Sequence, residues 1–72
     1  MNKERRKAIV ANIKAIELTI QDILSDEVDA YENMPENLQA SMRGMDSEDA
    51  QENLESAIEA LEEAISYLED IC

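Results

Sequence analysis

The sequence predicts an all-α fold, an antiparallel helical hairpin with a short connecting helix, which we expect to assemble as a homodimeric four-helix bundle. Two long stretches repeat apolar residues at intervals of three and four, the spacing that places side chains on one face of a helix. Between these stretches stand the only proline, Pro35, and the only glycine, Gly44. A chain of 72 residues makes one small domain, so residues 1–72 are expected to form a single helical unit.

The first helix is expected at about residues 3–32. Because the residue before a proline is pushed out of the helical conformation, this helix should end near Asn33. Arg6 and Glu27 fall on its apolar seam close to the helix ends, where long side chains can reach solvent; a buried pair that fixes the register is the alternative. The seam, which should face the partner helix, consists of Ile9, Ile13, Ile16, Ile20, Ile23 or Leu24, Val28 and Tyr31.

A short second helix is expected at about residues 35–42, because proline suits the first position of a helix. Gly44 can adopt the left-handed conformation that closes such a helix. Methionine and tyrosine in this connector suit adaptable contacts with a partner, although the same side chains can instead plug the end of the hairpin core. The candidate connector residues are Tyr31, Met34, Leu38, Met42 and Arg43.

The third helix is expected at about residues 47–71, with Asp46 or Ser47 as its cap. One flank of its apolar seam is small and the other is acidic, so two such helices cannot pair in parallel without stacking like charges. Antiparallel pairing with the first helix would instead place the basic residues 3–14 beside the acidic residues 59–70. The seam is Leu54, Ile58, Leu61, Ile65, Leu68 and Cys72, the small flank is Ala50, Ala57, Ala64 and Ile71, and the acidic flank is Glu48, Glu55, Glu62 and Glu69.

The first helix is apolar on a second face as well. Its solvated stripe is narrow, and a helix that is apolar on two sides is buried on both. One hairpin partner covers only one side, so we expect a second copy of the chain to cover the other. The solvated stripe is Lys14, Glu17 and Gln21, and the second face is Val10, Ala11, Ala15 and Leu18. The expected oligomer interface is Ile9, Val10, Ile13, Ile16, Leu18 and Ile20.

The composition excludes most kinds of catalytic and metal site. With no histidine and one cysteine, the chain cannot build a zinc site, a disulfide framework or a nucleophilic triad. We therefore expect no enzyme activity, no catalytic residue, no cofactor and no metal. Acids spaced three apart, such as Glu52 with Glu55 and Glu59 with Glu62, can hold magnesium in other helical proteins, but a solvated face is the favoured interpretation here.

Charge and hydropathy indicate where the protein acts. Eighteen acidic against six basic residues give a net charge of −12, which argues against direct binding to nucleic acid. No apolar run is long enough to span a membrane, and no signal peptide is recognisable. The lone Cys72 is expected as a small hydrophobe, with disulfide formation or metal capture as the alternatives, and it suits a reducing compartment.

The third helix is the most acidic part of the chain. It carries ten acids between Asp46 and Asp70 and no base. Neighbouring acids on a helix repel one another, so we expect this charge to serve binding to a basic surface, including a nucleic-acid-binding groove. Solubility alone is the alternative. The expected contact residues are Glu48, Glu52, Glu55, Glu59 and Glu62.

Two segments resemble short acidic proteins encoded by phages and prophages of Gram-positive bacteria. The segments are residues 1–9, Met-Asn-Lys-Glu-Arg-Arg-Lys-Ala-Ile, and the central motif Tyr31-x-Asn33-x-Pro35-Glu36-x-Leu38-Gln39-x-Ser41-x-Arg43-Gly44. The resemblance implies a helical, phage-associated protein in the host cytoplasm, with no catalytic residue to carry over. We therefore expect a non-enzymatic binding protein that occludes or inhibits a host protein, such as an antiviral defence component. A structural helical-bundle module is the alternative.

Overall fold

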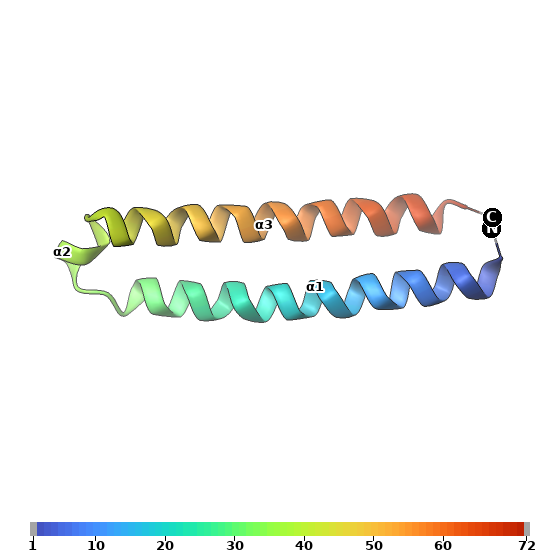
Figure 1. Cartoon of the computed structure of the whole chain (residues 1–72), viewed down its shortest axis with the longest axis horizontal. Helices are drawn as coiled ribbons and strands as arrows, with labels where there is room; N and C mark the ends of the chain where they lie inside the picture. Colours follow the sequence, from blue (N-terminus) through green and yellow to red (C-terminus); the bar gives the residue numbers. More distant parts are fainter. Residues whose placement is uncertain (1, 72) are drawn as a thin grey trace.

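The computed structural model describes residues 2–71 and confirms the predicted helical hairpin. Helices α1 (Lys3–Glu32) and α3 (Met42–Glu69) run antiparallel and are joined at one end by the short helix α2 (Glu36–Gln39), as Figure 1 shows. The molecule is a rod with extents of 54 × 15 × 11 Å. The seam position predicted for Cys72 lies outside the described residues.

Helix α1 has clear start and stop signals. The side-chain oxygen of Asn2 accepts a hydrogen bond from the backbone N–H of Glu4 at 2.8 Å, which satisfies one of the free donors of the first turn. At the other end Asn33 is the C-cap, two residues before Pro35. Because proline disfavours a helical conformation at the residue before it, the helix cannot continue through this point.

The predicted boundary between the second and third helices is wrong. Helix α2 ends at Gln39 rather than near residue 42, and α3 already begins at Met42, with Ser41 as its N-cap. Asp46 and Ser47, the predicted caps, therefore lie inside α3.

The reason for this difference is the role of Gly44. It lies buried within α3 and does not have a positive φ angle, so it does not close a helix. A Cβ atom at this position would overlap the backbone carbonyl of Gln39. Glycine therefore serves here through its missing side chain, which lets α2 pack closely against the start of α3.

The rotation of α1 about its axis also differs from the prediction. Of the predicted seam, Ile9, Ile16 and Ile23 are 38%, 52% and 49% exposed. Glu17, predicted on the solvated stripe, is half-buried instead. The buried or half-buried residues of α1, which mark the side toward α3, are Arg6, Val10, Ile13, Glu17, Ile20, Leu24, Glu27, Val28 and Tyr31.

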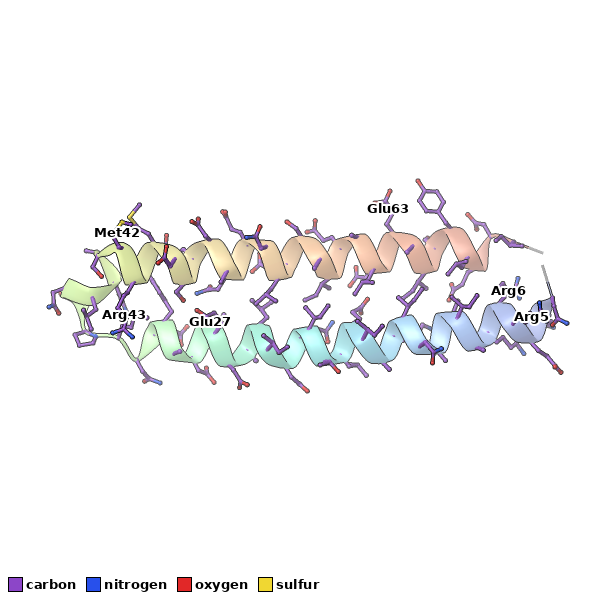
Figure 2. The ribbon with its side chains drawn as sticks, viewed as in Figure 1. Arg5, Arg6, Glu27, Met42, Arg43 and Glu63 are labelled. Carbon is purple, nitrogen blue, oxygen red and sulfur yellow. The ribbon has the colours of Figure 1, made fainter. Side chains whose placement is uncertain are left out.

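Hydrogen bonds near both ends of the hairpin account for this rotation. The Arg6 guanidinium donates to the backbone oxygen of Ile71, and the Glu27 carboxylate accepts from the Ser47 hydroxyl at 2.7 Å. Figure 2 shows Glu27 between the two long helices. Arg6 and Glu27 lie on one line along α1, so both bonds form only when that line faces α3. Arg6 and Glu27 therefore do not pair with each other. Both side chains are half-buried rather than extended into solvent.

The core between the helices is thin. Val10 and Ile65 are the buried apolar side chains among residues 2–71, each 9% exposed, and no large side chain in that range is fully buried. The other apolar side chains between the two long helices, including Ile13, Ile20, Leu54 and Leu61, are half-buried. A two-helix hairpin has one contact line, so each helix keeps most of its circumference in solvent.

Candidate interaction surfaces

The five glutamates predicted to bind a partner lie in one line along α3. Their spacing of four, three, four and three residues keeps them on one helix face, and all five are exposed. At a rise of about 1.5 Å per residue the line is about 21 Å long. We call Glu48, Glu52, Glu55, Glu59 and Glu62 the acidic stripe.

Arg43 lies in the first turn of α3, and the basic residues of α1 reach only the C-terminal end of α3. Lys14 Nζ lies 3.7 Å from Glu69 Oε1, and both side chains are more than half exposed. Such an exposed pair contributes little stability, about 0–1 kcal/mol. The Arg6 bond to the Ile71 oxygen places a cation at the negative end of the α3 dipole. The acidic stripe lies along α3 on the N-terminal side of these contacts, so most of its charge faces solvent.

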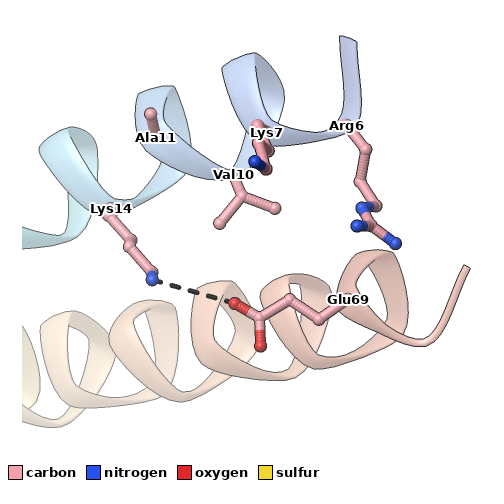
Figure 3. A pocket seen from close by; sticks show the side chains of 6 residues that line it. All are labelled: Arg6, Lys7, Val10, Ala11, Lys14 and Glu69. Atoms are coloured by element: carbon pink, nitrogen blue, oxygen red, sulfur yellow. Dashed lines mark ion pairs between the residues drawn. The ribbon is translucent and has the colours of Figure 1, made fainter. Parts of the chain in front are cut away.

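A groove runs between α1 and α3 on the side of the Lys14–Glu69 pair (Figure 3). It consists of two hollows of about 420 and 470 Å³ that share Lys14 and Glu69. Its floor is apolar and its rim is charged. The first hollow is lined by Arg6, Lys7, Val10, Ala11, Lys14 and Glu69, and the second by Lys14, Glu17, Leu18, Glu62, Ile65 and Glu69.

Glu17 is the anomalous residue of this groove. Its Oε1 atom is shielded from solvent and has no hydrogen-bond partner, while Oε2 accepts a long bond of 3.5 Å from Gln21. A buried carboxylate oxygen without a donor costs stability. Within residues 2–71 no group of three or more acidic or cysteine side chains is arranged to hold a metal ion.

The predicted connector residues divide into two sets. Tyr31, Met34 and Leu38 are half-buried at the end of the hairpin. Met42 is 73% exposed and Arg43 is also exposed, and Figure 2 shows Met42 pointing away from α1. The connector therefore provides both the expected plug and a small outward surface.

The hydrogen bonds of Gln39 and Ser47 were not predicted, and Ser47 was expected only as a possible helix cap. The Gln39 amide donates to the backbone oxygens of Tyr31 and Met34, at 3.0 and 3.1 Å, and so satisfies carbonyls at the end of α1. Ser47 is only 4% exposed and binds Glu27. The sequence could have indicated that Ser47 is buried, because Ser47 lies seven residues before Leu54 and this spacing places it on the seam of α3.

A hydrogen bond of Tyr31 links the end of α1 to the start of α3 beside the connector. Its hydroxyl donates to Glu48 at 2.6 Å, and this carboxylate raises the pKa of the Tyr31 hydroxyl, with smaller contributions from desolvation and charge repulsion. Since the raised pKa belongs to the folded state, the bond stabilises the protein below pH 10 and is lost as the pH rises through the higher value.

We expect tyrosinate absorbance in a Tyr67→Phe background, which leaves Tyr31 as the reporting tyrosine, to titrate with a midpoint above the usual value of about 10. Adding Glu48→Gln removes the negative acceptor and should bring the midpoint back toward that usual value. If Glu48→Gln left the midpoint of the Tyr67→Phe protein unchanged, the hydrogen bond to Glu48 would not be the cause of the raised Tyr31 pKa.

The residues predicted for an oligomer interface also divide. Val10 is buried against α3, and Ile13 and Ile20 are half-buried. These three belong to the hairpin itself. Ile16 is 52% and Leu18 62% exposed, and Ile9 is exposed as well. Ile9 and Ile16 lie on one side of the contact line with α3, whereas Leu18 lies on the other side, in the groove.

No helix within residues 2–71 is both long and apolar enough to cross a membrane. No protein-family model, curated protein or solved structure matches this chain.

Proposed function

We propose that this chain is a non-enzymatic binding protein of phage or prophage origin that occludes a basic surface of a host protein in the bacterial cytoplasm. An antiviral defence component with a nucleic-acid-binding groove is the kind of target that fits. The acidic stripe carries this proposal, because it presents five carboxylates on one rigid helix face with no cation along most of its length. A surface of this kind attracts and orients a basic partner.

The electrostatic setting favours binding over a purely solubilising role. The chain carries a net charge of −12, yet five of its six basic residues lie within residues 3–14, at one end of the hairpin. The acids of the stripe repel one another, at a cost of a few tenths of a kcal/mol for each neighbouring pair. A basic partner would remove this repulsion when it binds, so complex formation relieves a cost that the free protein bears.

A comparison of three immobilised proteins in a lysate of a Gram-positive host tests the proposal. The first is the wild type. The second, the stripe variant, changes Glu52, Glu55, Glu59 and Glu62 to glutamine. The third, a matched control, removes four charges from α1 by changing Asp22, Asp26, Asp29 and Glu32 to their amides; all four are exposed. We expect the wild type and the control, but not the stripe variant, to retain a basic protein.

The salt dependence of the affinity for the purified partner is the decisive measurement. We expect its affinity for the wild type to fall about tenfold or more between low and physiological ionic strength, mainly through the association rate. Expression of the wild type, but not of the stripe variant, should restore phage growth on a host whose defence depends on that partner. Equal retention by all three proteins, or an affinity indifferent to salt, would contradict the electrostatic mechanism.

A structural role is the second candidate, and the thin core favours it. The radius of gyration is 16.4 Å, whereas a compact domain of this length has about 11 Å. A single core of this size rarely supplies more than about 3–5 kcal/mol. We therefore also propose that two hairpins assemble as a homodimeric four-helix bundle. If the bundle alone is the function, the stripe variant will keep full activity.

A further inference from the structure

One broad face of the hairpin is apolar and exposed. The groove identifies the opposite face, because Lys14 and Leu18 of α1 and Glu62 and Glu69 of α3 all line it. The other flank of each helix must then lie on the far side. There α1 presents exposed isoleucines and α3 presents half-buried small residues. We call this surface, which contains Ile9, Ile16, Ile23, Ala57 and Ala64, the isoleucine–alanine face.

This face is free of charge over most of its length. The Arg6–Ile71 and Glu27–Ser47 bonds set the register, so residues 9–23 of α1 lie beside about residues 52–67 of α3. The other positions that helical spacing places on this side are neutral, including Asn12, Thr19 and Asn53. In a chain with 24 charged residues out of 72, an uncharged face on two helices indicates that the face is covered.

The accessible surface area of the chain is consistent with a second copy of the hairpin covering this face. The accessible surface of the chain is 5414 Å². A compact monomer of 8.1 kDa exposes about 4,500 Å², so the excess is about 900 Å². A stable protein interface buries about 800 Å² on each partner. A second hairpin with the same face supplies a matching uncharged surface of equal size.

We propose that the isoleucine–alanine face is the homodimer interface, with the connectors of the two copies at the same end of the bundle. This inference rests on the proposed bundle assembly and assigns its contact face. In this arrangement α1 of one copy lies on α3 of the other, so isoleucines meet alanines and large side chains fill the space above small ones. The basic residues 3–14 also lie near the acidic residues 59–70 of the other copy.

The reversed arrangement is disfavoured by charge. With connectors at opposite ends, α3 lies on α3 and the two most acidic helices become neighbours. In the favoured arrangement both acidic stripes lie on outer surfaces of the bundle, because the stripe and the isoleucine–alanine face occupy opposite flanks of α3. The dimer would therefore present two copies of the acidic stripe on opposite sides.

Two exposed apolar residues of α1 provide a matched test. Ile16 and Leu18 are 52% and 62% exposed, two residues apart, and lie on opposite sides of the hairpin. Changing either to lysine alters the net charge equally and leaves the contacts between α1 and α3 in place. Light scattering behind size exclusion over a hundredfold concentration range gives the mass of each protein, and circular dichroism confirms that each remains helical.

We expect the wild type and Leu18→Lys to have twice the chain mass of 8.1 kDa. Ile16→Lys should be monomeric, with a dimer dissociation constant raised at least about a hundredfold, because each dimer would bury two unpaired ammonium groups. Dimeric Ile16→Lys, or loss of the dimer in Leu18→Lys, would overturn the assigned face while the bundle proposal stands. A monomeric wild type would overturn both.

A distance measurement tests the arrangement without disturbing the face. A spin label on Asn37→Cys in a Cys72→Ser background sits on the exposed connector helix. With connectors together, two labels should be under about 30 Å apart, because neighbouring helices lie about 8–10 Å apart. With connectors at opposite ends the separation would approach the 54 Å length of the hairpin, and that result would overturn the proposed arrangement.

Discussion

Replacing Gly44 by alanine is expected to lower the free energy of unfolding by about 2 kcal/mol, although alanine is the better helix former by about 1 kcal/mol. Gly44 is buried inside α3, and a new Cβ would lie only 2.5 Å from the carbonyl carbon of Gln39. The obstacle is backbone, so no side-chain rotation relieves it, and α2 must move away from α3. Urea unfolding at a fixed protein concentration measures the change.

An exposed position in the same helix provides the control for helix propensity. Asn53 is exposed on α3, so Asn53→Ala adds a better helix former without a steric conflict. We expect this variant to be as stable as the wild type or slightly more stable. If Gly44→Ala were also stabilising, propensity alone would govern this position, and the close approach of α2 would not depend on glycine.

Replacing Glu17 by leucine is expected to raise the free energy of unfolding by about 1–3 kcal/mol, because it removes a buried carboxylate oxygen that lacks a donor. Glu17 lines the same hollow as Glu62 and Ile65, so leucine would add apolar contact and remove a negative charge from an acidic site. For a chain of this size each kcal/mol corresponds to a rise in Tm of about 4–8 °C.

Glu59→Leu is the matched control, since it makes the same chemical change at an exposed position of α3. We expect it to alter Tm much less, through weaker repulsion among neighbouring acids. Thermal unfolding of all three proteins at one concentration separates the two contributions. Equal shifts for the two variants would show that Glu17 matters only through its charge and not through its place between the helices.

Local patterns in the sequence were sufficient to predict the hairpin. Apolar repeats at helical spacing mark the two long helices, and Pro35 separates them. The acidic stripe was also predictable, because residues on one continuous helix share a face by their spacing alone. Neither prediction requires knowledge of how one helix packs against another.

The rotation of α1 was decided only by tertiary structure. Its apolar residues cover so much of the helix that two lines, one through Ile16 and one through Glu17, both suit a partner helix. Two hydrogen bonds select the second line: Arg6 donates to the Ile71 oxygen just beyond α3, and Glu27 accepts from the Ser47 hydroxyl of α3. The role of Gly44 is of the same kind, since it depends on the backbone of α2 reaching the start of α3. Spacing determines which residues share a face, whereas contacts between helices determine which face is buried.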